Sequence, residues 1–208
     1  MSKVVVQVAD YVEDLRHTIQ VAALNFDIWW AYKQRRDRAR FVDVLNTYPL
    51  FFQTSIQAHF AALVVALYHV YETRSDTFNV PRLLLRLENE RALPRRTLAS
   101  IRRREATAKK LWIKVCVLRH KAIAHRANTY SFADVYREAQ VKPNDLRRLL
   151  KQTQRLLNRI TRALDRSSHA FNLRALKDTR RMLADLKAYN IERSNKPLHR
   201  PRGRAAGR

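Results

Sequence analysis

Glycine is almost absent from this chain of 208 residues, and both copies, Gly203 and Gly207, lie within the last six positions. Between Met1 and Pro201, therefore, no residue can adopt a positive φ angle without a steric cost. Glycine-rich phosphate loops, dinucleotide-binding turns and nucleophile elbows need glycine where the backbone bends or approaches a ligand. Tight β-hairpins favour it as well. The sequence thus predicts an all-α protein whose function is carried by side chains.

Basic residues are concentrated in the second part of the chain. Residues 1–90 contain ten basic and ten acidic side chains, whereas residues 91–208 contain 32 basic and eight acidic ones. The second part therefore carries the whole net charge of +24. Such an asymmetry indicates a surface that binds a polyanion, most often a nucleic acid. The alternative is an arginine-rich composition on solvated helices.

The remaining composition predicts one domain over residues 1–191 and a basic tail over 192–208 that is disordered when free. The single cysteine, Cys116, lies between two valines, which predicts a small core residue and excludes an intramolecular disulfide. The N-terminus lacks the pattern of a signal peptide. The most apolar run, residues 60–68, is shorter than the roughly 20 residues of a membrane span. We therefore expect a cytoplasmic protein without a membrane segment.

Apolar residues at spacings of three and four predict helices over most of the chain. The expected helices cover residues 5–35, a piece ending near 48, 51–71, a short piece after 79, 94–126, a small piece ending at 139, 144–166 and 169–190. The helix over 51–71 is apolar on most sides and should be the most buried element. Asn79 and Asn144 are the expected caps of the helices that follow them.

Paired catalytic carboxylates and metal sites have little support in the sequence. Acidic residues are scarce, and no pair of them falls inside an apolar segment. His120 and His125 are five residues apart, whereas two metal ligands on one helix face should be three or four apart. Four further histidines are interpreted as hydrogen-bonded structural or surface residues, namely His17, His59, His69 and His169. We expect neither a metal nor a cofactor.

One basic segment combines the groups that RNA cleavage requires. Residues 117–126 close the long predicted helix, and their charged or titratable members are Arg119, His120, Lys121, His125 and Arg126. Histidine can take or give a proton near neutral pH, and fixed cations can stabilise the charge that builds on a phosphate during attack by a 2′-hydroxyl. The alternative is a cationic helix end that is stabilised by the helix dipole.

The spacing of this segment constrains its geometry. On a straight α-helix Arg119 and His125 would point about 120° apart, because six residues each turn the helix by about 100°. The two side chains can share one target only if a helix end lies between them or a second subunit supplies one of them. The sequence Ala-Asn-Thr-Tyr-Ser over 127–131 is expected to end the helix just beyond His125.

The string Arg119-His-Lys-Ala-Ile-Ala-His125 resembles the R-x4–6-H motif of HEPN-domain proteins. Within that superfamily it is similar to the abortive-infection AbiU-like group, in which Arg-Asn-Lys-x-x-Ala-His ends a long helix. The segments over 25–30 and 141–146 also resemble this group, so that the likeness covers roughly residues 5–190.

This resemblance implies an antiparallel helical bundle of the HEPN type with accessory helices, which forms a homodimer and brings two such segments into one cleft. It further implies a metal-independent endoribonuclease that acts as a toxin or antiphage effector, with an antitoxin protein as a potential partner. Arg119 would hold the scissile phosphate and His125 would be the acid–base group, while the substrate would be contacted by His120, Lys121 and Arg126. The group commonly has Asn where His120 stands, and a histidine there can hydrogen-bond RNA or add a second titrating group.

Two other functions stay open on the sequence. A non-catalytic HEPN module could bind RNA or a protein partner through its basic half, and the departure at His120 favours this alternative. A DNA-binding helical protein ranks lower, because no short helix-turn-helix pair carries base-reading side chains between apolar anchors. Retention of both Arg119 and His125 favours the enzyme.

Overall fold

The computed structural model describes residues 6–124, 139–171 and 173–195, and within these ranges the chain forms helices and no β-strand. The elements are α1 (Val8–Lys33), α2 (Arg35–Thr47), α3 (Pro49–Tyr71), α4 (Val80–Asn89), α5 (Arg95–Leu118), η1 (Arg119–Ala124), α7 (Pro143–Leu164) and α8 (Ala175–Asn195). The predicted all-α fold class is confirmed.

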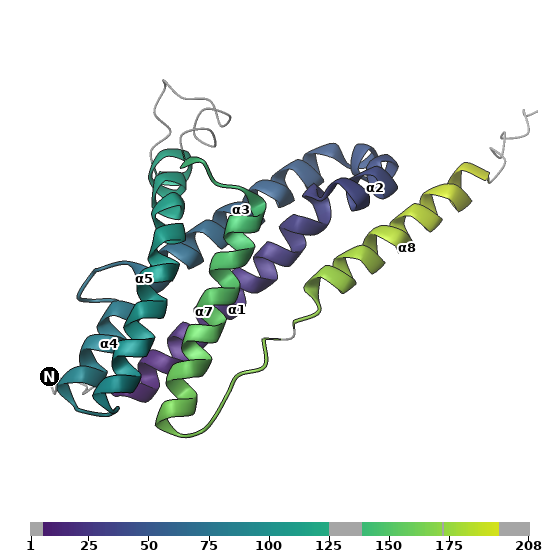
Figure 1. Ribbon diagram of the computed structural model, residues 1–208. Helices are drawn as coiled ribbons and strands as arrows, with labels where there is room; N and C mark the ends of the chain where they lie inside the picture. The colour runs from purple at the N-terminus through teal and green to yellow at the C-terminus, as the bar shows by residue number, and fades with distance from the viewer. Residues whose placement is uncertain (1–5, 125–138, 172, 196–208) are drawn as a thin grey trace, which may run out of the picture.

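The helices form an antiparallel bundle with one helix set apart from it (Figure 1). α1 and α3 run side by side in opposite directions, and α5 and α7 form a second antiparallel pair packed on them. α8 leaves the bundle and lies against α1 and α2. There Leu183 enters a second small core, and Arg180 Nε donates a hydrogen bond of 2.8 Å to the buried carboxylate of Asp37.

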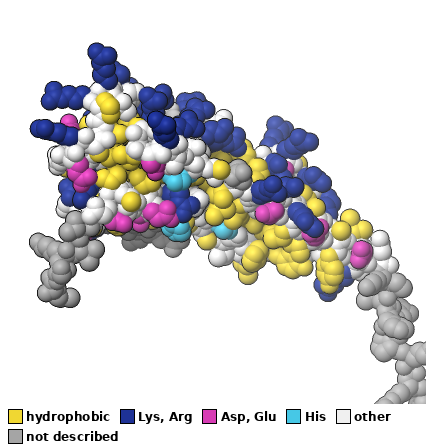
Figure 2. Space-filling view, turned by 90° about the horizontal axis from the view of Figure 1, so that it is seen from below, with side chains coloured by type: hydrophobic (Ala, Val, Ile, Leu, Met, Phe, Trp, Pro, Cys, Tyr) yellow, Lys and Arg dark blue, Asp and Glu magenta, His cyan; other side chains and the backbone are white. Residues whose placement is uncertain are grey.

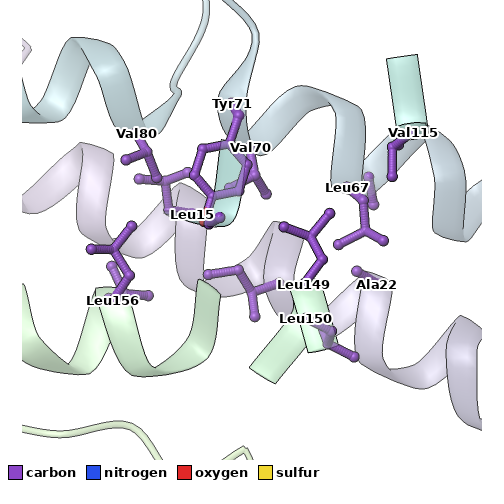
Figure 3. Close-up of a cluster of buried hydrophobic side chains, with 14 of the residues drawn as sticks. Leu15, Ala22, Leu67, Val70, Tyr71, Val80, Val115, Leu149, Leu150 and Leu156 are labelled. Atoms are coloured by element: carbon purple, nitrogen blue, oxygen red, sulfur yellow. The ribbon is translucent and has the colours of Figure 1, made fainter. Parts of the chain in front are cut away.

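The main core lies where α1, α3, α5 and α7 meet (Figure 3). Buried residues of α1 recur every three or four positions, so that one face of this helix is turned inward. Residues drawn together from the four helices include Leu15, Ala22, Leu67, Val70, Val115, Leu149 and Leu150. This packing fixes the end of α5 relative to the second half of α3.

α3 is buried mainly in its second half, although Phe52 near its start is buried in the second small core. Its first turn leaves Leu50 and Phe51 78 % and 62 % exposed, so the expectation that the whole helix is the most buried element is wrong there. The second half is the more buried because α5 and η1 pack on that part of the helix. By length and composition α3 also qualifies as a membrane span, which the run over 60–68 alone did not indicate. A core helix of a folded bundle meets the same criterion.

The two asparagines that were expected to be caps behave differently. Asn79 caps α4 as predicted, since its side-chain oxygen accepts a backbone N–H at 2.9 Å. Asn144 does not cap α7, because the helix already begins at Pro143. Proline suits a first turn, where its missing N–H leaves no donor unpaired. The carboxylate of Asp145 then accepts the backbone N–H of Lys142 at 3.1 Å and completes this helix start.

α8 begins at Ala175 rather than at the predicted residue 169. Asn158 of α7 explains the difference: its amide donates to the backbone oxygen of His169 at 3.0 Å and accepts the backbone N–H of His169 at 2.8 Å. Both backbone groups of His169 are therefore engaged by α7 and are not available to a helix. α8 continues to Asn195, into the stretch predicted as a tail, and residues 196–208 lie outside the described part of the chain.

In place of glycine, three other residues adopt positive φ angles in the described part: Arg91 at 52°, Gln140 at 46° and Arg166 at 65°. Arg91 ends α4. The backbone N–H of Ala92 bonds to the oxygen of Leu87 at 3.0 Å, and that of Arg91 to the oxygen of Glu88 at 3.1 Å. This is the bonding pattern of a helix end at which glycine is the usual left-handed residue.

Replacing Arg91 by glycine should stabilise the protein relative to Arg91→Ala. Both variants lose the same charge, but only glycine removes the clash of Cβ in the left-handed region, which costs about 1–2 kcal/mol. The greater freedom of glycine in the unfolded chain offsets about 0.5–1 kcal/mol of this gain. We expect a net increase of about 0.5–1 kcal/mol in the free energy of unfolding, measured by urea denaturation with far-UV circular dichroism. A glycine variant less stable than the alanine variant would contradict this account.

Candidate functional site

The predicted Arg–His segment begins where the helix changes type. α5 ends at Leu118, and Arg119 to Ala124 form η1, a π-helical turn in which backbone bonds span five residues. Turns of this kind are rare and occur frequently at functional sites. The straight α-helix that would separate Arg119 and His125 by about 120° is therefore not present over this segment. His125 and Arg126 lie outside the described residues.

The side chains of Arg119 and His120 meet on one aromatic ring of α3. The guanidinium carbon of Arg119 lies 4.8 Å from the ring centroid of Tyr68. The imidazole of His120 approaches the same ring edge-on, with 5.7 Å between the centroids. A cation over an aromatic face is attracted by the ring quadrupole, by about 0.5–2 kcal/mol depending on exposure. Tyr68 thus holds the first two residues of the predicted motif together.

Tyr68 is itself fixed by the basic helix. Trp112 of α5 stacks on its ring with 5.9 Å between centroids, and the indole Nε1 of Trp112 donates a hydrogen bond of 3.0 Å to the backbone oxygen of Tyr68. The indole N–H is thereby satisfied while its ring is partly buried. Because Trp112 lies about two turns before Arg119 on the same chain segment, α5 both carries the arginine and positions the ring on which it rests.

Of the five predicted site residues, three are described. Arg119 is half-buried, His120 is exposed and Lys121 is of intermediate exposure. Arg119 and His120 are brought together by Tyr68. Tyr68 and Trp112 were not among the predicted residues. A tryptophan in a helix dominated by Arg and Lys is the one sign of this contact in the sequence, whereas nothing there distinguishes Tyr68 from the other aromatic residues of α3.

An ion pair joins α5 to the start of α7, on either side of residues 125–138, which lie outside the described part of the chain. The ammonium of Lys114 donates to the backbone oxygen of Gln140 at 2.9 Å and to Oδ2 of Asp145 at 3.0 Å. Burial by itself would raise the pKa of Asp145, but hydrogen bonds from Lys114 and from the backbone of Lys142 outweigh it and lower this pKa. The start of α7 is therefore tied to the last turns of α5 by a charged carboxylate.

Cys116 lies one turn before Arg119 and is half-buried rather than a full core residue. Burial raises the pKa of its thiol to about 11, and the nearby charge of Arg119 opposes this only weakly. At neutral pH the sulfur is thus a protonated thiol. Because the thiolate is the reactive form of cysteine, Cys116 is not suited to act as a nucleophile.

His17 and His69 are exposed, the buried Nε2 of His169 has no hydrogen-bond partner among the described residues, and His59 has structural surroundings. His59 Nδ1 lies 2.8 Å from the amide oxygen of Asn25, and burial lowers the pKa of His59. This agrees with the interpretation of His59 as a hydrogen-bonded structural residue. Over the described ranges, no three His, Cys, Asp or Glu side chains come together in an arrangement that could hold a metal ion.

Comparison with known proteins gives one match. A family model described as AbiU2, a HEPN family, matches residues 6–181 of the chain. Among curated proteins and among solved structures nothing matches. The matched range contains Tyr68, Trp112 and Arg119, as well as the two stretches over 25–30 and 141–146 on which the resemblance was based.

The Tyr68 contact predicts a specific change in NMR spectra. Tyr68→Leu keeps an apolar side chain at this place but removes the ring, so the Arg119 side-chain Nε–H signal should lose its upfield ring-current shift. Tyr68→Phe should preserve that shift, because the ring face remains. The measurement is a proton–nitrogen correlation spectrum of the three proteins. An Arg119 signal unchanged in Tyr68→Leu would show that the guanidinium does not rest on this ring in solution.

Proposed function

The chain belongs to the AbiU2 family of HEPN proteins, and from this premise we propose that it is a metal-independent endoribonuclease of the toxin or abortive-infection type. The observation that carries the proposal is the placement of Arg119, which opens a π-helical turn at the end of the basic helix α5 and rests on Tyr68. A planar and permanently charged group held in this way suits a phosphate, which it can bind through two parallel hydrogen bonds.

In the proposed reaction a 2′-hydroxyl of RNA attacks the adjacent phosphorus. His125 takes the proton of the hydroxyl, the bond between phosphorus and the 5′-oxygen breaks, and this oxygen leaves after receiving a proton. The products are a 2′,3′-cyclic phosphate and a 5′-hydroxyl. Arg119 stabilises the charge that builds on the non-bridging phosphate oxygens. The flanking parts of the substrate are contacted by His120, Lys121 and Arg126.

A homodimer supports this chemistry better than a single chain. The base that takes a proton and the acid that gives one act on opposite sides of the same phosphorus, and each chain has one His125. A second copy supplies a second histidine, so that two Arg119–His125 segments form one cleft. We further propose that the protein acts in the cytoplasm, where RNA is the substrate and an antitoxin protein would restrain the activity.

Arg119→Ala and His125→Ala should each abolish most of the cleavage of structured RNA in the presence of EDTA. Proton transfer by a positioned side chain contributes about 10²–10⁴-fold to a rate, and we expect losses within this range for His125→Ala. Cleavage is followed on denaturing gels with end-labelled RNA. Matched controls are His17→Ala and Arg36→Ala, which remove the same side-chain types from exposed positions on α1 and α2.

Two outcomes would decide against the enzyme as proposed. Cleavage that survives His125→Ala would remove the acid–base assignment. RNA binding without cleavage by the unmodified protein would instead favour the non-catalytic HEPN module that binds RNA or a protein partner.

Mixing the two inactive variants should restore part of the activity if the site is composed of two chains, because one of the two histidines is still missing. In a dimer with one Arg119→Ala chain and one His125→Ala chain, one intact arginine and one intact histidine remain, on different chains. Cleavage by the mixture, after partial unfolding and refolding to exchange subunits, should exceed that of either variant alone. A mixture as inactive as its components, although light scattering shows mixed dimers, would mean that each chain needs its own Arg119 and His125.

A further inference from the structure

A groove of about 370 Å³ lies between α5 and α7, away from the η1 turn. Its lining residues are Ser100, Arg103, Arg104, Thr107, Gln152 and Arg155. All of them are basic or neutral polar, and none is acidic. The groove therefore has the electrostatic character of an anion-binding site.

The arginines of this groove have no carboxylate partner in the described part of the chain. Three other basic residues of α5 are paired, namely Arg102 with Glu88 at 2.5 Å, Lys109 with Glu105 at 3.0 Å and Lys114 with Asp145 at 3.0 Å. Arg103, Arg104 and Arg155 form no ion pair with any described residue. Three like charges around one groove repel each other, and a bound anion would relieve this repulsion.

The groove continues as two rows of basic side chains. On α7 the exposed residues spaced three or four apart, and hence on one face of the helix, are Arg148, Lys151, Arg155, Arg159 and Arg162. On α5 the corresponding basic residues are Arg96, Arg103, Lys110 and Lys114, with the neutral Thr107 between them. Figure 2 shows Lys and Arg side chains gathered along the upper edge of one face, with the acidic side chains mostly below them.

The dimensions of these rows fit an extended polyanion. The row on α7 spans about 21 Å, because fourteen residues each rise 1.5 Å. Along α5 the distance from Arg103 to Arg119 is about 24 Å by the same rise. Charges repeated about one helical turn apart on α7 and about one to two turns apart on α5 match a chain of phosphates better than a protein segment, whose acidic groups have no such period. Gln152 adds a buried side-chain oxygen without a partner among the described residues, which can accept a hydrogen bond from a base N–H or a ribose hydroxyl, but not from a phosphate.

We propose that the groove between α5 and α7 is a track for the phosphate backbone of a single RNA strand, which leads the strand toward Arg119. Arginine suits this role because its guanidinium can bind a phosphate through two hydrogen bonds. The groove lies between two directly packed helices. The inference rests on the proposed function only in the choice of RNA as the ligand.

The test is the salt dependence of binding to a labelled single-stranded RNA with methylated 2′-hydroxyls, which cannot be cleaved by 2′-hydroxyl attack. The triple variant Arg103→Gln, Arg104→Gln, Arg155→Gln should bind about tenfold or more weakly at moderate salt. Its plot of log K against log salt should flatten by about 2, because each phosphate contact on a single strand contributes about 0.7 to the slope. Fluorescence anisotropy at several salt concentrations measures both quantities.

The matched control removes three exposed arginines at the far end of the bundle, Arg35→Gln, Arg36→Gln and Arg38→Gln on α2. It loses the same charge and should change the slope by less than half as much. Thermal unfolding followed by circular dichroism should be unaltered in both variants, because none of the six arginines forms an ion pair with a described residue.

Equal flattening in both triple variants would overturn the proposal, because net charge alone would then explain binding. An unchanged slope in the groove variant would overturn it as well. Displacement of the strand by polyglutamate as effectively as by unlabelled RNA of equal charge would point to an acidic protein partner instead. If the groove variant alone loses binding while the unmodified protein cuts no RNA, the track stands and the proposed cleavage does not.

Discussion

The packing of α5 and η1 on the second half of α3 is the contact on which the candidate site depends. Leu67 and Val70 face the main core, and Tyr68 between them turns its ring to Trp112, Arg119 and His120. The same turn of α3 therefore contributes to the core on one side and supports the motif on the other. A substitution that loosened the packing of α5 and η1 on α3 would lower the stability of the protein and would also displace Arg119. The candidate site is, in this sense, an extension of the core.

Much of the fold followed from local physical rules. The scarcity of glycine and the three-and-four spacing predicted the all-α class, and Asn79 predicted a helix cap. The sequence was misleading or silent where contacts between residues far apart in the chain determine the local structure. Asn158 holds His169 out of α8, and the ring of Tyr68 supports Arg119, although neither pair is close in sequence. The spacing of the basic residues on α5 and α7 is present in the sequence, but only the packing of the two helices brings the two rows to one groove.

The uneven charge of the chain acquires a structural meaning from the ion pairs. In the electrically neutral part several arginines are paired locally, as in the pairs Arg16 with Glu13, Arg74 with Asp76 and Arg86 with Glu90, although Arg35, Arg36 and Arg38 of α2 are not paired with any described residue. On α7 no member of the exposed basic row forms an ion pair within the described chain. Surface ion pairs of this kind contribute little to stability, about 0–1 kcal/mol. The distribution of ion pairs therefore indicates which surface remains charged and available to a ligand. It contributes little to the stability of the bundle.

The ion pair between Lys114 and Asp145 spans 31 positions of sequence and fastens both ends of the stretch that contains His125 and Arg126. The entropy of closing a loop grows only with the logarithm of its length, so that doubling such a stretch costs about 0.6 kcal/mol. Insertions and deletions between these two anchors are consequently cheap in folding free energy. Related chains therefore have room to vary the length and composition of this stretch while the packing of α5 against α7 stays the same.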